Sequence, residues 1–455
     1  MNGTTDPGLM KGAMMNKTLK YVGVAGLGAA LFASLPAWAQ AAAPAPTVNK
    51  GDTAWMMTST LLVLMMIVPG LALFYGGLTR AKNMLSTMTQ IGAVACLAML
   101  IWVMYGYTMA FGDGGNDFVS GFGKAFLAGI TPDSTAATFT AGVAIPEYVF
   151  ICFQMTFAAI TIALVLGSVV ERMKFSAVMV FGAVWLTIVY FPVAHMVWAS
   201  GGLFFKMGAL DFAGGTVVHI NAGVSALVAA LILGKRIGYP TERMAPHSLT
   251  MTGIGTGLLW VGWFGFNAGS ALEANGSAAL AMINTFVATA AAALAWMLVE
   301  RANGHKGSAL GFCSGIVAGL VAVTPAAGNS GPFGAIILGA VASVVCYYAV
   351  SFLKPKLGYD DALDAFGVHG VGGMIGAIGT GIVYAPTLGG PGKPDFNMGH
   401  QLIVQIEAVA TTIVWAGVGT VIAIYVAKAV TGLRVSPEVE REGLDIGEHG
   451  ERAYN

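Results

Sequence analysis

The chain has 455 residues, of which 56% are hydrophobic and only 10% are charged, whereas soluble domains carry about 25% charged residues. This composition excludes an ordinary soluble domain and predicts an integral membrane protein. The 22 basic residues balance the 22 acidic residues, so the net charge gives no indication of a nucleic-acid partner.

The amino terminus has the pattern of a signal peptide. Lys17 and Lys20 precede an apolar stretch, residues 21–36, that is too short to cross a bilayer. The small-x-small triplet AWA follows at residues 37–39, as at a signal-peptidase site. We therefore predict a signal peptide over residues 1–39, in which the residues before Met14 have the character of an upstream start.

The rest of the chain predicts an all-α polytopic membrane protein, because about 20 apolar residues cross a bilayer as one helix. Residues 40–430 contain eleven such stretches, and residues 431–455 form a polar tail. The predicted spans are 53–76, 87–111, 148–168, 175–197, 215–233, 249–270, 277–299, 308–325, 331–353, 365–384 and 401–430. Since eleven is odd, the two ends of the mature chain face opposite sides.

The distribution of Lys and Arg predicts the orientation, because cytoplasmic loops carry an excess of them. With the mature amino terminus outside, the inner loops and the tail contain 15 of these residues and the outer segments contain 4. The sequence therefore predicts an N-out, C-in topology with a cytoplasmic tail.

Ten spans, without the last, divide into two halves of five that run in opposite directions, which is the inverted-repeat plan of many transporters. The fifth span carries His219 in "DFAGGTVVHINAG", and the tenth carries His369 in "DAFGVHGVGGMIG". The repeat should bring the two histidines together. The predicted edges place them near opposite ends of their spans, so they meet only if both helices start deep in the protein.

Three interpretations of the paired histidines remain open. They are core residues bonded to neighbouring carbonyl groups, axial ligands of a haem, or a proton-handling site in a conduction path, which is the default for ionisable groups inside a membrane. Imidazole suits the third role because one ring nitrogen donates while the other accepts.

Aromatic residues gather near the outer ends of several spans. In the predicted orientation, this outer group comprises Phe153, Phe157, Trp198, Trp263 and Phe266, with Ser270 beside them. They form either an interfacial belt or a cage that attracts a desolvated cation to the faces of the rings, with the serine hydroxyl as an acceptor.

The sequence gives no indication of a metal site or another cofactor. No carboxylate joins the aromatic residues within the spans. The four cysteines, Cys96, Cys152, Cys313 and Cys346, lie in apolar runs without CxxC spacing, so we interpret them as packing residues of the core.

Nine segments in order closely resemble the ammonium transporters of the Amt/MEP/Rh family, over essentially everything after the signal peptide. They are GLALFYGGLTRAKNMLS, FQMTF, SVVERMKFSA, HMVWASGGLF, GALDFAGGTVVHINAG, GWFGFNAGSA, GIVAGLVAVTPAAG, DAFGVHGVGG and GLRVSPEVEREGLDIGEHGERAY. The resemblance implies transport rather than catalysis. It also implies an eleven-helix pore in each subunit of a homotrimer in the bacterial inner membrane, and ammonium or ammonia as the permeant species.

The resemblance also implies roles for single residues. By position these are Phe157, Trp198 and Ser270 as the outer recruitment site, Phe157 and Phe266 as the stacked gate, and His219 and His369 as the pore histidines. The family's buried aspartate corresponds to Asp211, for which capping of the fifth helix and direct attraction of the cation both remain open.

The expected mechanism follows from the cost of desolvation. An ammonium ion in a narrow apolar lumen loses its hydration, and desolvation lowers the pKa of a cationic amine by up to about 3 to 5 units. Ammonia would then pass the histidines, with co-movement of the proton along the imidazole rings. In the family the tail docks against neighbouring subunits and couples to PII signalling proteins. The alternative function is therefore an ammonium sensor that acts through such a partner.

Overall fold

The computed structural model describes residues 47–454, and the predicted signal peptide lies outside them. In this part of the chain, eleven helical segments are long and apolar enough to cross a membrane, which confirms the predicted number. We number them as spans 1 to 11 in chain order: Lys50–Leu78, Ala81–Phe111, Glu147–Ser168, Phe175–Met207, Gly215–Leu233, Leu249–Gly269, Gly276–Ala302, Ala309–Ala326, Pro332–Leu357, Phe366–Val383 and Met398–Thr431.

Several spans consist of more than one helix. Spans 1 to 5 contain α2 (Lys50–Met65), α3 (Ala72–Leu78), α4 (Met84–Ile101), α5 (Tyr107–Phe111), α6 (Glu147–Val165), α7 (Phe175–Trp185), α8 (Phe191–Trp198), α9 (Leu203–Met207) and α10 (Asn221–Leu233). Spans 6 to 11 contain α11 (Leu249–Gly269), α12 (Gly276–Ala302), α13 (Ala309–Val323), α14 (Pro332–Tyr348), α15 (Lys354–Leu357), α16 (Val371–Val383) and α17 (Met398–Thr431). The largest difference from the predicted edges is at span 4, because α9 follows α8 after a short turn.

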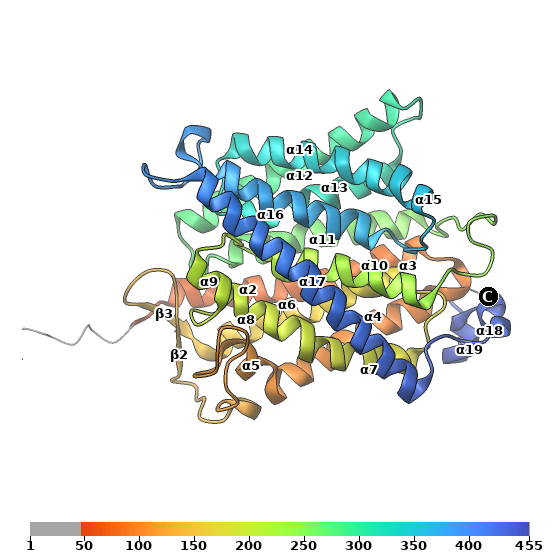
Figure 1. Cartoon of the computed structure of the whole chain (residues 1–455), viewed down its shortest axis with the longest axis horizontal. Coiled ribbons are helices and arrows are strands. Elements are labelled where there is room, and N and C mark those ends of the chain that lie inside the picture. The colour runs from red at the N-terminus through yellow and green to blue at the C-terminus, as the bar shows by residue number, and fades with distance from the viewer. Residues whose placement is uncertain (1–46, 455) are drawn as a thin grey trace, which may run out of the picture. The chain divides into compact units, whose positions relative to one another are not determined.

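Small elements mark the two ends of the helical bundle (Figure 1). One end, called the strand end here, carries β1 (Thr47–Val48), β2 (Thr135–Ala137) and β3 (Val143–Pro146), in the order β1-β3-β2. Strand β3 pairs parallel with β1 and antiparallel with β2. The other end, the tail end, carries the short tail helices α18 (Pro437–Glu442) and α19 (Leu444–His449).

Burial separates the central spans from the peripheral ones. In the most apolar stretch of spans 3, 5 and 8, 78% of the residues are buried, against 39% in spans 9 and 11. A helix that is apolar all round and buried belongs to the centre of a membrane protein. Spans 3, 5 and 8 are therefore in position to line a central path, while spans 9 and 11 present a wide face to the surroundings.

Irregular turns recur at equivalent places in the two halves of the chain. Spans 3 and 8 both end in a 3₁₀-turn, Leu166–Ser168 and Thr324–Ala326. Spans 4 and 9 both contain a π-turn, and spans 5 and 10 both begin with one, Gly215–Ile220 and Phe366–Gly370. Together with the odd number of spans in each half, these matches identify two inverted five-span repeats followed by span 11.

Spans 5 and 10 cross in direct backbone contact. A Cβ atom on Gly223 would collide with the backbone of Gly370, and one on Gly373 would lie 3.0 Å from Cβ of His219. The two glycines are each four residues after a histidine, so the crossing has the same form on both sides. Small residues permit this close approach of membrane helices, and the crossing brings the two histidines together.

Substitution of Gly223 by alanine should therefore disrupt the crossing. We expect Gly223→Ala to lower the stability of the solubilised protein by about 3 kcal/mol, since overpacking against backbone atoms has no flexible neighbour to move. Gly417→Ala is the control, because no heavy atom lies within 4 Å of the added Cβ there. Equal melting temperatures of the two variants in detergent would contradict this assignment.

The cysteines differ from the prediction in part. Cys313 and Cys346 are buried, as expected, but Cys96 and Cys152 are exposed on the surface of the bundle. Apolar runs in a membrane protein contain lipid-facing as well as core-facing positions, so hydropathy alone does not separate them.

Candidate functional site

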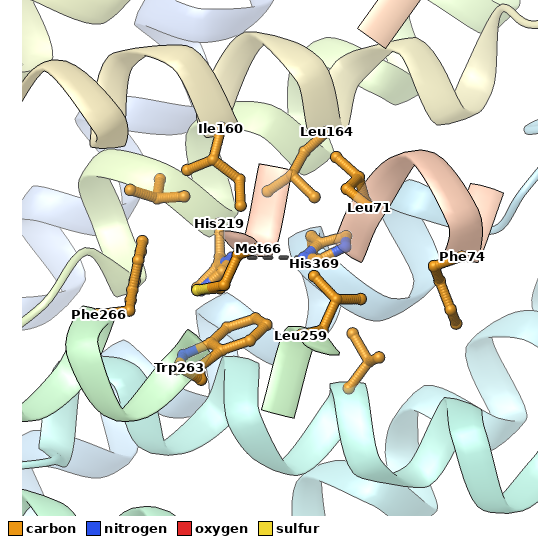
Figure 2. A pocket seen from close by; sticks show the side chains of 12 residues that line it. Met66, Leu71, Phe74, Ile160, Leu164, His219, Leu259, Trp263, Phe266 and His369 are labelled. Carbon is orange, nitrogen blue, oxygen red and sulfur yellow. Dashed lines mark hydrogen bonds between the residues drawn. The ribbon is translucent and has the colours of Figure 1, made fainter. Parts of the chain in front are cut away.

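An enclosed apolar cavity lies at the crossing of spans 5 and 10 (Figure 2). The cavity has a volume of only about 10 Å³, close to the minimum for one small molecule. Its lining residues come from spans 1, 3, 5, 6, 8 and 10 and are Met66, Leu71, Phe74, Ile160, Leu164, Val218, His219, Leu259, Trp263, Phe266, Val317 and His369. A hydrated ion does not fit such a space.

The two histidines meet inside this cavity, as the repeat predicts. Their Nδ1 atoms are 3.3 Å apart, and the rings lie nearly parallel, with centroids 5.3 Å apart at 22°. Hydrogen bonding between two Nδ1 atoms requires one to donate and the other to accept, so the two rings hold different tautomers when both are neutral. The Nε2 atom of His219 is buried and has no hydrogen-bond partner among the described residues.

The structure resolves the difficulty that the predicted span edges raised. Spans 5 and 10 are short, and each is preceded by a non-helical segment with buried residues, 209–214 and 360–364. Both helices therefore start within the protein rather than at its surface. His219 and His369 lie in the first turns of these two helices, and those first turns meet.

Aromatic rings form a continuous column that leads from the strand end to the histidines. Trp198 meets Phe157 edge to face at 5.6 Å, and Phe157 stacks on Phe266 at 4.2 Å and 16°. Phe266 lies 6.1 Å from the ring of His219. The stacked pair of phenylalanines closes the column between Trp198 and the cavity.

The two remaining aromatic residues of the outer group, Phe153 and Trp263, lie outside the column. Phe153 is fully buried and packs edge-on against Phe157 at 4.8 Å, so it supports that ring from behind. Trp263 was predicted at the mouth, but its ring stacks on His219 at 5.4 Å, in the wall of the cavity. One helical turn separates Trp263 from Phe266, which explains why hydropathy placed them together.

Ser270 lies at the end of span 6, one turn beyond Phe266. Its hydroxyl donates to the Phe266 carbonyl at 2.8 Å, and the residue is 9% exposed. Because its only hydrogen is used within the helix, the oxygen can serve any guest only as an acceptor.

Asp211 caps the start of span 5. One carboxylate oxygen accepts from the backbone N–H groups of Gly214 and Gly215 at 2.9 and 2.6 Å, and the other accepts from Thr216 and Val217 at 2.9 and 3.1 Å. The Asp211 carbonyl also accepts from the indole N–H of Trp198 at 2.9 Å. Of the two predicted roles, the geometry supports the cap, and it adds the positioning of Trp198.

Sequence reasoning missed several residues of the cavity wall. Ile160 and Leu164 follow Phe157 at helical spacing, and Leu259 precedes Trp263 by one turn, so a projection of spans 3 and 6 would have found them. The role of Thr324 had no such signal. Its hydroxyl accepts from the indole N–H of Trp263 at 2.9 Å, which fixes the ring that stacks on His219.

A wider vestibule continues from the cavity toward the tail end. It has a volume of about 400 Å³ and shares Phe74, Val317 and His369 with the narrow cavity. Polar groups such as Glu300, Lys354 and Asp364 line it, and Lys354 pairs with Asp364 at 2.6 Å. His369 therefore stands between a narrow apolar space and a wide polar one.

The tail packs on helix starts of its own chain. Asp445 accepts from the N–H groups of Leu85 and Ser86 at 3.1 and 2.7 Å, and Glu448 accepts from that of Phe175 at 2.8 Å. Acidic side chains at helix amino termini satisfy free N–H groups and complement the helix dipole. The tail thus stabilises the starts of spans 2 and 4.

Comparison with known proteins gives a consistent result. The model of the Ammonium Transporter Family matches residues 54–454. An ammonium transporter of Aquifex aeolicus is 49% identical over 413 residues, which cover 90% of this chain and 94% of that protein. The crystal structure of Mep2 from Candida albicans is 33% identical with a TM-score of 0.78, over 86% of this chain and 87% of that one. A structure described as a sensor Amt protein is 28% identical with a TM-score of 0.79, over 88% and 98%.

Proposed function

Because the chain belongs to the ammonium transporter family and is a multi-pass membrane transporter, we propose that it recruits ammonium at the aromatic column, removes a proton and conducts ammonia past His219 and His369. The observation that carries this proposal is the Nε2 atom of His219, which has no hydrogen-bond partner among residues 47–454 and faces a cavity whose wall is apolar apart from the two histidines. A buried polar atom without a partner is costly unless a guest satisfies it.

Recruitment takes place at Trp198, Phe157 and Ser270. The ring faces attract the cation, and the Ser270 oxygen accepts one of its N–H groups. The Phe157 and Phe266 pair then separates this site from the cavity, so passage requires movement of these rings. Potassium can visit the same site but has no proton to lose, so the obligatory deprotonation provides the selectivity.

The histidine pair supplies a route for the proton. A proton that arrives at Nε2 of His219 lets its Nδ1 proton pass to Nδ1 of His369, 3.3 Å away, and the Nε2 proton of His369 leaves into the vestibule. Neutral ammonia passes through the cavity itself. In this scheme one proton moves with each ammonia, and the tautomers of the two rings reset before the next cycle.

Reconstitution into liposomes tests this proposal. Purified protein under an inward ammonium gradient should give a current, and an equal potassium gradient should give none. Ammonia flux without any current would remove the proton route and leave net ammonia conduction.

The recruitment site should control apparent affinity. We expect Trp198→Leu to weaken it about ten-fold, equivalent to ~1.4 kcal/mol of lost cation–π attraction. Ser270→Ala should weaken it about five-fold, through the loss of one hydrogen bond. Concentration dependence of the current measures both effects. Potassium currents in either variant would mean that this site, rather than deprotonation, is the filter.

The cellular setting of the protein is also a proposal. Residues 1–39 are a signal peptide, and the mature chain lies in the inner membrane with the strand end outside and the tail end in the cytoplasm. The excess of Lys and Arg at the tail end supports this orientation. We propose that three copies assemble as a homotrimer with one pore in each subunit.

A second candidate function is ammonium sensing through a PII-type partner at the cytoplasmic face. The structural similarity to a protein described as a sensor Amt protein is the observation that supports this second candidate. The two functions differ in flux, because a dedicated sensor should pass no ammonium in liposomes.

Removal of the tail tests the partner proposal. Deletion from Val435 onward should abolish PII-type inhibition while some flux persists, because the tail contacts helix starts rather than the cavity. The truncated protein should also melt earlier, since it loses the caps from Asp445 and Glu448. Glu442→Gln, at an exposed position in α18, is the matched control and should keep both inhibition and stability. Full inhibition of the truncated protein would exclude the tail as the docking element.

A further inference from the structure

A turn at the strand end exposes its aromatic side chains and covers its charged one, which is the opposite of what a loop in water does. This aromatic turn, residues 122–127, lies between α5 and β2 (Figure 1). Its phenylalanines point outward, with Phe122 62% and Phe126 70% exposed, while the side chain of Lys124 between them is only 27% exposed. A loop surrounded by water would be expected to show the opposite arrangement.

Polar contacts fasten the turn to the ends of spans 2 and 3. The Lys124 ammonium pairs with Glu147 at 2.7 Å, and the hydroxyl of Tyr107 donates to the same carboxylate at 2.7 Å. The backbone N–H of Lys124 donates to the Thr108 hydroxyl at 3.1 Å, and that hydroxyl donates to the carbonyl of Gly121 at 2.8 Å. The phenylalanines are therefore held outward by an ordered framework.

The backbone of the turn is itself unfavourable. Phe126 and Leu127 have φ values of 55° and 58°, in the left-handed region that residues with a Cβ atom seldom occupy. Such strain persists where the surroundings impose it, and it concentrates at functional positions. Here it directs the Phe126 ring away from the bundle.

Ile130 closes the turn and contacts the exposed side of span 3. Its N–H donates to the carbonyl of Leu127 at 3.1 Å. The hydroxyl of Tyr148, in the first turn of that span, donates to the carbonyl of Ile130 at 3.0 Å, and Tyr148 is itself 38% exposed. Cys152, one helical turn further along the same face, is also exposed. The aromatic turn is therefore continuous with the surface that span 3 presents to its surroundings in the membrane.

The size of the apolar surface favours lipid over a second copy of the chain. Two phenylalanines exposed by about two thirds offer on the order of 250 Å², whereas a stable protein interface buries about 800 Å² on each partner. The neighbouring part of the loop is charged, with the side chain of Asp113 93% exposed and an exposed ion pair between Asp117 and Lys206. The turn by itself therefore offers too little apolar surface for a subunit interface, and the charged residues that precede it in the loop do not enlarge that surface.

We propose that the aromatic turn is a membrane-interface anchor, with Phe122 and Phe126 inserted at the boundary between lipid headgroups and acyl chains. Aromatic side chains are enriched at this depth. The anchor is also connected to the helix that carries a recruitment residue. Ser120, just before the turn, lies 2.9 Å from Nδ1 of His195. His195 lies three residues before Trp198 on α8. The anchor thus holds the outer segment against the helix that carries Trp198.

Spin labelling in liposomes tests the anchor without any measurement of transport. Single cysteines replace Phe122, Phe126 and, as the control, the exposed Asp133 of the same loop, in a background of Cys96→Ser and Cys152→Ser. Each cysteine carries a nitroxide, and its collision rates with oxygen and with a water-soluble nickel chelate are measured. Since the labelled positions are exposed, the substitutions leave the packed core intact.

The anchor predicts a ratio of oxygen to nickel collisions several-fold higher at positions 122 and 126 than at position 133. A ratio equal to that at position 133 would place the turn in water. Low collision rates with both reagents, with dipolar broadening between labels on different chains, would place it between copies. Either of these two results overturns the proposal, and neither depends on the transport mechanism.

Discussion

Replacement of Arg236 by methionine should lower the free energy of unfolding of the solubilised protein by about 3 to 5 kcal/mol, the usual cost of breaking a buried ion pair from one side. Arg236 is 6% exposed and lies in the loop between spans 5 and 6. Its guanidinium donates to both carboxylate oxygens of Asp360, each at 2.8 to 2.9 Å, and to Glu171 at 2.8 Å. The variant leaves the Asp360 carboxylate buried without this partner.

A matched control separates this effect from the general loss of a charge. Lys206 pairs with Asp117 at 2.7 Å, but both side chains are about half exposed, 53% and 48%. Exposed pairs contribute about 0 to 1 kcal/mol. Lys206→Met should therefore leave the melting temperature nearly unchanged. A similar fall in melting temperature in both variants would show that Arg236 is not the centre of a stabilising ion-pair cluster with Asp360 and Glu171.

The same cluster predicts how stability changes with pH. Burial alone would raise the pKa of Glu171, but Arg236 and Arg80 outweigh it and lower that pKa to about 2 from its ordinary value of 4.5. A carboxyl with a lowered pKa stabilises the folded state fully above its unfolded pKa, and this contribution disappears as the pH falls through the folded pKa. Stability of the wild type should thus decline from about pH 4.5 toward pH 2, and less steeply in Arg236→Met.

The fold was largely predictable because hydropathy and charge are strong signals in a membrane protein. The number of spans followed from apolar length, and the inverted repeat followed from the division of ten spans into two halves. The irregular turns were not predictable. The π-turns at Gly215–Ile220 and Phe366–Gly370 depend on the contact between spans 5 and 10, which no local pattern encodes.

The candidate site was predictable to different degrees. His219 and His369 were identified by their equivalent positions, and the close approach of Gly223 to Gly370 gives the physical reason why they meet. The place of Trp263 could not be predicted, because the direction of its ring depends on Thr324 in span 8. The capping of spans 2 and 4 by tail residues was equally hidden, since partners such as Asp445 and Ser86 lie 359 residues apart.

Replacement of His219 by aspartate should convert selective ammonium transport into a leak for potassium. The cavity would gain an acceptor that carries negative charge, next to His369 and within an apolar wall. A bare cation could then cross while paired with this charge, so deprotonation would no longer be obligatory. Ammonium-dependent current should persist or rise, and potassium current should appear.

The double replacement of His219 and His369 by leucine should have the opposite result. Without a ring nitrogen in the cavity, neither the proton route nor a charged partner for a cation remains, so the current should fall to background. If the histidines were merely packing residues, both variants would lower the folded yield and neither would change selectivity. The decisive measurement is therefore the potassium permeability of well-folded His219→Asp protein in liposomes, and continued exclusion of potassium there would refute deprotonation as the source of selectivity.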